Sequence, residues 1–388
     1  MKIAMIIPDN RDEFREYDKP VPCFGPAPAA LLEGLAEKPD CEVHLVSCVH
    51  RAMTAPGKIA GNIYCHAAGV GQWGWLRGGY LGCIRAVRRK LREIQPDIVH
   101  GQGTERYCAL AAVFSGFPNV ITIHGNMRAV AEFYRSPIGS FHWLAARLEP
   151  LALRKTVGVF CNSAYTERLV APQAKRVWRV PNALRAPFLD RPLSTSRPAH
   201  PILLNVGSLL AHKRQTEILA VARKLWQRGF RFELQFAGDT HTKNGYTANF
   251  LRQLREAESA GYARHLGELP LDRLIAVMDA ASALVHFPGE EAFGLVVAEA
   301  LARNLKLFAG STGGVADIAT GVEGAELFPG QDWPGLEKSL ARWLETGCLR
   351  PQSASAVMHQ RYAPEVIARR HIEIYREALS TRSYTPFN

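Results

Sequence analysis

The chain has no apolar run long enough to cross a membrane. Its longest hydrophobic stretches are interrupted well before the roughly 18 residues that a membrane-spanning helix needs. The first residues, Met1–Pro8, are too few and too quickly followed by charged residues to resemble a signal peptide. These absences predict a cytoplasmic protein whose first residues form a β-strand.

Cysteines at metal-binding spacing are also missing. The eight cysteines include no Cys-x-x-Cys pair, and most lie within apolar, strand-like runs. This pattern favours reduced, structural thiols over disulfides or a zinc site, and we predict no metal site. There is no repeat of short, fixed period, which excludes a solenoid.

What is present is the composition of an ordinary soluble globular protein. Of the 388 residues, 47% are hydrophobic and 21% are charged. A chain of this length exceeds the usual size of one hydrophobic core. We therefore expect two domains of roughly 180 to 200 residues each.

The chain carries a formal net charge of +11, part of which lies in the helical pattern Arg85–Arg92. This basic segment is either a solvated helix face or a surface for an anionic partner, namely membrane phospholipid or an acidic acceptor. No stacking aromatic residues interleave with its arginines, so nucleic acid is not a predicted partner.

Short apolar runs alternate with longer amphipathic segments, as in a parallel sheet covered by helices. A polar, proline-rich stretch, Pro187–Pro201, interrupts the alternation and is predicted to be a linker. We expect an α/β fold of two doubly wound, Rossmann-like domains. The predicted divisions are an N-terminal domain over 1–186, the linker over 187–201, a C-terminal domain over 202–363, and a final helical segment over 364–388 that packs back on the N-terminal domain.

The individual elements follow from the same patterns. Predicted strands include Lys2–Ile7, Glu42–Cys48, Ile98–Gly101, Val120–His124, Gly158–Asn162, Ile202–Val206, Phe232–Ala237, Ala283–Phe287 and Ala325–Phe328. Predicted helices include Ala29–Glu37, Leu81–Ile94, Phe141–Arg154, Gln215–Arg228, Leu271–Ala280, Gly294–Arg303 and Pro364–Leu379.

The segment Pro288–Glu299 places two carboxylates around a glycine-containing turn between a strand and a helix. The start of a helix favours anions because its first backbone N–H groups are unpaired and its dipole is positive there. Glu291 and Glu299 add acceptors suited to sugar hydroxyls. A nucleotide-sugar, with its sugar, diphosphate and ribose, has the layout that these groups require.

The second domain opens with a strand, Gly207, and a loop that carries Lys213 and Arg214 before the next helix. Such a loop is either a phosphate clamp or an ordinary turn between strand and helix. The pair Gly313–Gly314, after a later strand, likewise indicates either close approach to a ligand or a tight turn.

Taken in order, these motifs resemble the retaining nucleotide-sugar glycosyltransferases of family 4, which have the GT-B fold of two domains facing across a cleft. The motifs are Gly-x-Leu-x-x-x-Lys at Gly207–Lys213, Glu-x7-Glu around Phe-Gly-Leu at Glu291–Glu299, and Gly-Gly-x-x-Asp at Gly313–Asp317. In the first half, Thr122–Gly125 resembles the acceptor-side Thr-x-His-Gly, and Val180–Asn182 resembles the Pro-Asn-Gly turn.

The resemblance implies roles for individual residues. Glu291 lies beside the donor sugar, Lys213 neutralises the diphosphate, and His124 faces the donor sugar and the acceptor. Glu299 holds the ribose. Backbone or nearby contacts to the donor are implied for Gly25, Gly207, Ser208, Arg214, Gly267, Leu269, Phe293, Gly294 and Leu295.

The chain also departs from the family pattern. Ser208 stands where many relatives have an arginine, which leaves Arg214 or Lys243 to assist Lys213. Asn182 is followed by Ala183 rather than glycine, and Asn304 stands where glycine is usual. These departures bear on the donor site more than on the fold.

The implied function is transfer of a sugar, with retention, from a UDP-, GDP- or ADP-sugar to a hydroxyl acceptor, without a cofactor. The chain lacks Asp-x-Asp, a common metal-ion motif in the other major transferase fold, which fits a metal-independent reaction. We expect a lipid-linked acceptor in lipopolysaccharide, capsule or glycolipid synthesis, and peripheral association with the inner face of the membrane. The alternatives are a soluble acceptor, a nucleotide-sugar epimerase and a non-catalytic surface-binding protein.

Overall fold

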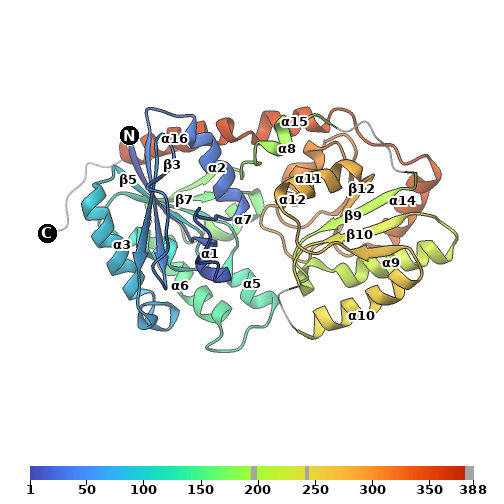
Figure 1. Ribbon diagram of the computed structural model, residues 1–388, viewed down its shortest axis with the longest axis horizontal. Coiled ribbons are helices and arrows are strands. Elements are labelled where there is room, and N and C mark those ends of the chain that lie inside the picture. The colour runs from blue at the N-terminus through green and yellow to red at the C-terminus, as the bar shows by residue number, and fades with distance from the viewer. Residues whose placement is uncertain (194–198, 241–243, 381–388) are drawn as a thin grey trace. The chain divides into compact units, whose positions relative to one another are not determined.

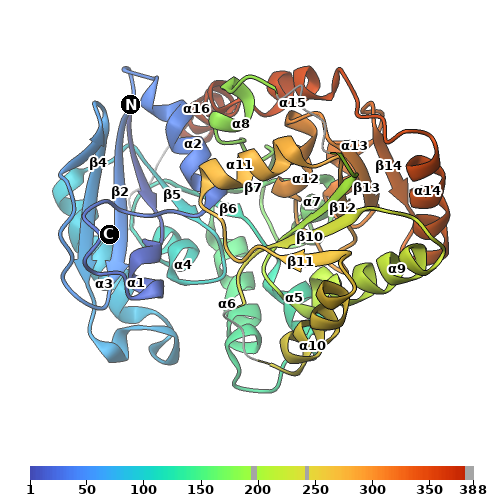
Figure 2. The ribbon, with the colours of Figure 1, turned by 45° about the vertical axis from the view of Figure 1, so that its right-hand side comes forward.

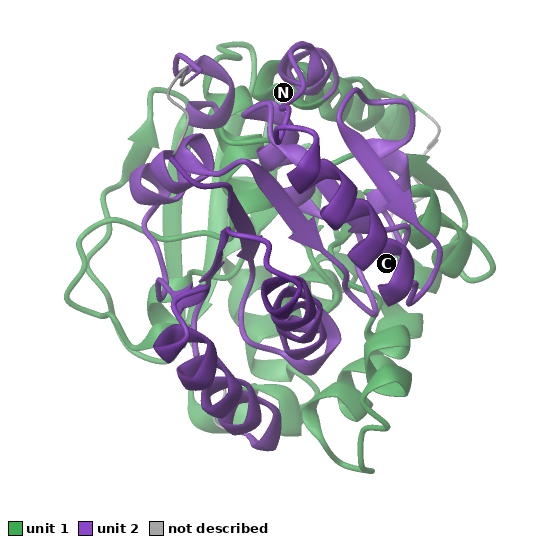
Figure 3. Cartoon of the chain, turned by 90° about the vertical axis from the view of Figure 1, so that its right-hand side faces the viewer, with its two compact units in different colours: residues 1–185, 362–388 green, residues 186–361 purple. Residues whose placement is uncertain are grey.

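The computed structural model describes residues 1–193, 199–240 and 244–380. The chain divides into two compact units, coloured separately in Figure 3. Unit 1 comprises Met1–Arg185 together with the chain from Tyr362 onward, and unit 2 comprises Ala186–Arg361.

Unit 1 is built on an eight-stranded sheet (Figure 1). Its strands are β1 Lys2–Ile6, β2 Glu42–Val49, β3 Lys58–Ala60, β4 Ile63–Gly69, β5 Ile98–Gln102, β6 Asn119–Ile123, β7 Gly158–Cys161 and β8 Val177–Arg179. The order across the sheet is β3-β4-β2-β1-β5-β6-β7-β8, and every pair is parallel except β3 with β4. The chain order therefore reverses between β1 and β5.

Helices cover both faces of this sheet. They are α1 Asn10–Phe14, α2 Pro26–Ala36, η1 Gln72–Gly74, η2 Leu76–Gly78, α3 Leu81–Ile94, α4 Tyr107–Val113, α5 Met127–Phe133, α6 Phe141–Lys155, α7 Ala164–Val170 and α16 Pro364–Ser380. Successive side chains of a strand face opposite sides, so Ile3 and Met5 pack with α2 and α16. Ala4 and Ile6 pack on the other side, with α3 and α4.

The last helix, α16, belongs to unit 1. Gly34 of α2 lies so close to it that a Cβ added there would come within 2.1 Å of the Pro364 carbonyl oxygen. Further along, the Tyr375 hydroxyl is 2.6 Å from Nδ1 of the buried His100 on β5. A glycine contact and a buried polar contact thus fix α16 against the sheet.

Unit 2 is built on a six-stranded, fully parallel sheet (Figure 2). Its strands are β9 Ile202–Val206, β10 Glu233–Ala237, β11 Ala263–His265, β12 Ala283–His286, β13 Lys306–Gly310 and β14 Ala325–Phe328. The order is β11-β10-β9-β12-β13-β14, so the chain order reverses between β9 and β12. Its helices are α8 Pro187–Asp190, η3 Ala211–Lys213, α9 Gln215–Gln227, α10 Gly245–Ser259, α11 Leu271–Ala280, α12 Leu295–Ala302, α13 Val315–Ala319, α14 Trp333–Glu345 and α15 Ala354–Tyr362.

The two doubly wound parallel sheets confirm the predicted fold class. Reading 187–201 as a linker was wrong for its first part. Pro187–Asp190 forms α8, Phe188 is fully buried, and the buried Arg303 guanidinium donates to the carbonyl oxygens of Arg191 at 2.7 Å and Pro192 at 2.6 Å. The burial of Phe188 makes the start of this proline-rich stretch a packed element of unit 2. Residues 194–198 lie outside the described residues.

Within the described ranges, no helix is both long enough and apolar enough to cross a membrane. Five of the eight cysteines are buried as free thiols, namely Cys41, Cys48, Cys83, Cys108 and Cys161.

Candidate functional site

The candidate donor site lies where the strand order of unit 2 reverses. In doubly wound sheets, ligands bind at the carboxyl ends of the strands on either side of such a reversal. Here these strands are β9, which leads into Gly207, and β12, which ends at His286. The loops that follow these two strands carry Lys213 and Glu291.

Lys213 ends the short helix η3, and Arg214 separates it from α9. Its side chain lies over Gly207, where an added Cβ would be 3.9 Å from the lysine Cδ. Gly207 also touches the next turn, because a Cβ on Gly238 would come within 2.0 Å of the Gly207 carbonyl oxygen. Arg214 has a left-handed backbone, with φ of 56°, and lets the chain turn from η3 into α9.

Glu291 joins Lys213 to a histidine that the sequence analysis did not single out. The carboxylate Oε2 is 2.7 Å from Lys213 Nζ and 3.2 Å from His286 Nε2. Burial alone would raise the pKa of Glu291, but the Lys213 charge and the His286 contact outweigh it and hold the pKa well below its usual range. Glu291 is therefore a carboxylate at neutral pH.

His286 is buried at the end of β12. Burial lowers its pKa, although the Glu291 carboxylate acts in the opposite direction. The neutral imidazole can donate only one N–H, and a carboxylate only accepts, so we assign the proton to Nε2. His286 thus orients Glu291 without cancelling its charge.

The loop that carries Glu291 is held by backbone contacts on both sides. The Gly289 N–H donates to the His212 carbonyl at 2.6 Å, and the Gly314 N–H donates to the Glu291 carbonyl at 3.0 Å. Gly294 then starts α12 with a φ of 98°, a conformation that favours glycine. Gly314, the second of the glycine pair after β13, packs closely against this loop.

Replacing Gly314 with alanine should therefore disturb the site. A Cβ there would lie 2.6 Å from both the Ala292 carbonyl oxygen and the Phe293 Cα, which are backbone atoms. We expect a loss of about 1 to 3 kcal/mol in the free energy of unfolding. Displacement of Glu291 should also lower kcat/KM roughly 10- to 100-fold.

The matched control is Gly310→Ala, because a Cβ at Gly310 meets its neighbours at ordinary distances of 3.5 to 3.6 Å. Chemical denaturation and steady-state kinetics of the two variants would make the comparison. Equal behaviour of the two would contradict the packing role of Gly314.

Other residues predicted for the donor have places of their own in unit 2. Glu299 is buried on α12, and the hydroxyl of Ser208 donates to the Asp239 carboxylate. The Gly267 carbonyl accepts from Gly238 N–H at 2.9 Å, and Leu269 is half-buried near it in the chain. Lys243 lies outside the described residues. Phe293 is buried and Leu295 half-buried, on either side of Gly294.

His124 and Gly25 belong to unit 1. His124 follows β6, and its Nε2 is 3.0 Å from Oε1 of Gln102, at the end of β5. Burial lowers the pKa of His124 to about 4, so the ring is neutral at physiological pH. Gly25 is the N-cap of α2. The space beside it is open, because an added Cβ would meet only Pro28, at 3.8 Å.

A half-buried acid beside His124 was missed by the sequence analysis. The Glu105 carboxylate accepts the N–H of Gly125 at 3.0 Å, and burial raises its pKa to about 7. The nearby Glu149 carboxylate adds to that rise. The available signal was a carboxylate three residues beyond a buried strand, at the same sheet edge as His124.

In the described part of the chain, no group of three His, Cys, Asp or Glu side chains is placed to hold a metal ion.

Comparison with known proteins gives matches to two family models. The family model for Glycosyltransferase Family 4 matches residues 29–185, and that for Glycosyl transferases group 1 matches residues 190–357. A search of curated protein sequences gives no significant match.

Several solved structures share the fold across nearly the whole chain. A sucrose-phosphate synthase from Thermosynechococcus elongatus has a TM-score of 0.72 at 17% identity, over 98% of this chain and 100% of that one. Anabaena HepE, in complex with UDP and glucose, has a TM-score of 0.69 at 16% identity, over 97% and 100%. The lipopolysaccharide outer core galactosyltransferase WaaB, in its apo form, has a TM-score of 0.68 at 14% identity, over 97% and 100%.

At these identities the structural similarity establishes only the fold. The family models, in contrast, match the amino-acid sequence and therefore bear on family membership. One model matches within unit 1 and the other within unit 2. The chain belongs to the group 1 glycosyltransferases, with a first half of the Family 4 type.

Proposed function

We propose that this protein is a retaining glycosyltransferase that moves a sugar from a nucleoside-diphosphate sugar to a hydroxyl acceptor. The observation that carries the proposal is the 2.7 Å contact between Lys213 and Glu291, at the point where the strand order of unit 2 reverses. It puts a cation for a diphosphate next to a carboxylate for sugar hydroxyls, matching the sugar–phosphate junction of such a donor. Anabaena HepE, which shares the fold, has been solved with UDP-glucose, and this supports the donor class.

In the proposed reaction, the bond between the sugar C1 and the diphosphate oxygen breaks, and a new bond forms from C1 to the acceptor oxygen. Negative charge grows on the leaving diphosphate, where Lys213 and the backbone N–H groups around Gly294 and Leu295 stabilise it. An ammonium group has three N–H donors, so the contact with Glu291 leaves donors for phosphate.

Retention follows if the acceptor attacks on the face from which the diphosphate leaves. The leaving phosphate oxygen then takes the acceptor proton, and no protein base is required. Glu291 positions the sugar by accepting from its hydroxyls, held in place by His286. His124, neutral at physiological pH, offers a hydrogen bond without a charge on the acceptor side.

The remaining donor contacts are proposals of the same kind. Glu299 holds the ribose, backbone groups at Gly267–Leu269 contact the base, and the backbone N–H of Phe293 contacts the sugar and diphosphate beside Gly294. Gly25 and Gly207 allow close approach to phosphate, with Ser208 and Arg214 near it in the chain. The base is uridine, guanosine or adenosine.

We further propose a lipid-linked acceptor in lipopolysaccharide, capsule or glycolipid synthesis, at the cytoplasmic face of the membrane. Two features support it. The exposed side of α3 carries Arg85, Arg88, Arg89 and Arg92. One protein of the same fold, WaaB, is a lipopolysaccharide outer core galactosyltransferase.

The test begins with thermal shift in the presence of UDP, GDP and ADP, because a ligand that binds the native state raises the melting temperature. The matching sugar nucleotide is then supplied with candidate acceptors, with and without EDTA. We expect release of nucleoside diphosphate, an EDTA-insensitive rate, and a product whose anomeric configuration equals that of the donor.

Each other outcome removes one part of the proposal. An inverted linkage by NMR rules out retention, and loss of activity in EDTA rules out metal independence. An isomerised sugar nucleotide without release of nucleoside diphosphate would indicate the epimerase alternative.

A further inference from the structure

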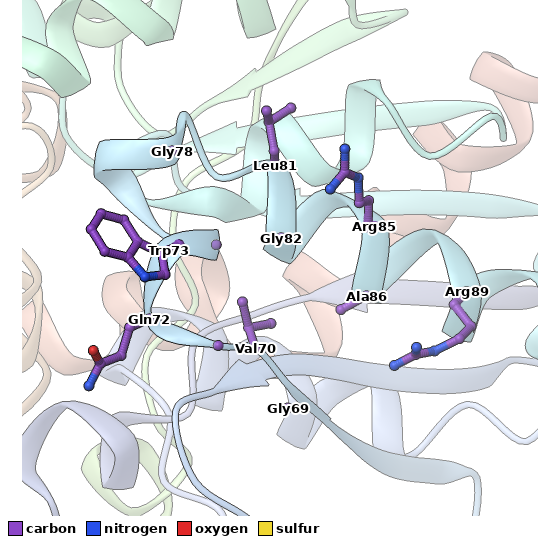
Figure 4. Close-up of a pocket in the computed structure, with 12 residues that line it drawn as sticks. Gly69, Val70, Gln72, Trp73, Gly78, Leu81, Gly82, Arg85, Ala86 and Arg89 are labelled. Carbon is purple, nitrogen blue, oxygen red and sulfur yellow. The ribbon is translucent and has the colours of Figure 1, made fainter.

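Unit 1 contains a pocket of about 560 Å³ beside the basic helix α3. It is formed by the end of β4, the turn η1 and the first turns of α3. Figure 4 shows Trp73 on one side of it and Arg85 and Arg89, both from α3, on the other, with Val70 between them. No residue proposed above to bind the donor lines this pocket.

The pocket combines positive charge with exposed apolar side chains, and the acidic side chain nearest to its arginines along α3 is Glu93, one turn beyond Arg89. Arg85 and Arg89 lie one helical turn apart and are exposed, and neither has a hydrogen bond or ion pair within the described residues. Trp73 is 88% exposed and Leu81 is 56% exposed. A ligand that matches both features carries a negative charge joined to an apolar part.

The pocket wall is already formed by backbone packing. A Cβ on Gly82 would lie 2.4 Å from the Gly74 Cα, so η1 and the start of α3 touch through two glycines. Trp75 stacks on His50, with ring centroids 3.8 Å apart, and donates its indole N–H to the Val70 carbonyl. The neighbouring Trp73 projects from this fixed turn.

We propose that this pocket binds the phosphate of an anionic phospholipid headgroup. Guanidinium groups suit phosphate because they donate paired hydrogen bonds in one plane. Trp73 and Leu81 would enter the boundary between headgroups and acyl chains, where tryptophan is favoured. The exposed apolar side chains argue for a lipid over a soluble phosphate, which would gain nothing from them.

The position of the pocket relates it to His124. β4 and β6 are both parallel to the strands between them, so their carboxyl ends lie at the same edge of the sheet. They are four strand spacings apart in the order β4-β2-β1-β5-β6, which is about 19 Å. A membrane held at the pocket would present acceptors to the edge that carries His124, so this inference rests on the proposed function.

The experiment is flotation of the whole protein with vesicles of phosphatidylcholine alone or mixed with phosphatidylglycerol. The double variant R85Q/R89Q should bind the mixed vesicles about 30-fold more weakly, because each basic residue near an anionic surface contributes roughly fivefold. R88Q/R92Q is the matched control, since it removes equal charge from the same helix outside the pocket. We expect its loss to be several-fold smaller.

Trp73→Ser should weaken the binding that persists at high salt, which screens charge but not apolar contact. All variants should keep their thermal shift with nucleoside diphosphate, because Lys213 and Glu291 lie in unit 2. If no nucleoside diphosphate stabilises the wild-type protein, the proposed function fails, whatever the vesicles show.

Three results would overturn the pocket assignment alone. Equal losses in the two arginine pairs would mean diffuse attraction to the whole helix. Equal binding to vesicles with and without phosphatidylglycerol would remove the need for an anionic headgroup. Vesicle binding that R85Q/R89Q leaves unchanged, together with a loss of inorganic phosphate binding by calorimetry in the same variant, would indicate a soluble phosphate ligand.

Discussion

Replacing Lys213 with alanine should lower kcat about 100- to 1,000-fold, the loss typical of removing one charge stabiliser at a reacting centre. The physical reason is that Lys213 is the proposed cation for the leaving diphosphate. It lies 2.7 Å from Glu291, where the strand order of unit 2 reverses. The variant should also bind nucleoside diphosphate at least tenfold more weakly. Single-turnover kinetics and calorimetric titration would measure the two effects.

The same substitution leaves Glu291 without its cation, so part of its effect is on stability. Because both side chains are only partly buried, we expect a loss of about 1 to 3 kcal/mol in the free energy of unfolding. Lys306→Ala is the matched control, since Lys306 pairs with Glu326 at 3.1 Å and begins β13, at the opposite edge of the sheet. It should cost stability without changing nucleotide affinity. Unaltered turnover and affinity in the Lys213 variant would refute the phosphate role.

Glu291→Gln should lower kcat/KM by about 100-fold or more while changing nucleoside diphosphate affinity less than threefold. The amide keeps the size of the side chain but loses the charge that accepts from sugar hydroxyls. Measuring kcat/KM and nucleoside diphosphate affinity separately distinguishes two positions for Glu291. A carboxylate that faced the phosphates would repel them, so its removal would tighten nucleoside diphosphate binding.

Glu290→Gln is the control for this variant, as it removes a neighbouring charge from the same loop. It should leave kcat/KM nearly unchanged.

The stability of the Glu291 variant provides a second test. The pKa of Glu291 lies below its usual range in the folded protein, so its stabilising contribution is present at neutral pH and is lost as the pH falls. The Glu291 variant should therefore be less stable than the wild type at pH 7, and the difference should shrink on acidification. Full activity of this variant would refute the sugar-positioning role.

Much of the fold follows from sequence because buried parallel strands are continuous apolar runs. β9, α11, β14 and α3 have the same bounds as predicted, and most other predicted elements differ by only a few residues. Short elements escaped because their stability comes from contacts distant in sequence. α1, for example, holds the buried Arg11, which pairs with Asp9 at 2.7 Å and donates to the Thr54 carbonyl.

The candidate site was predictable to the extent that it lies in local motifs. Lys213 and Glu291 were identified by their spacing, and the structure brings them together. His286 was missed because its contact with Glu291 depends on the turn between them, and Glu105 because its partner, Gly125, lies on another loop. The packing of Phe188 was hidden for a related reason, since α8 lies against α12, which is more than 100 residues later in the chain.

The return of α16 to unit 1 has a consequence for biosynthesis. Domains generally fold in the order in which the ribosome releases them. Here the helix that covers α2 and reaches His100 through Tyr375 is made only after every residue of unit 2. The nascent chain must carry a sheet face that only α2 covers in part through nearly half of its translation, so the unit that is made first is completed last.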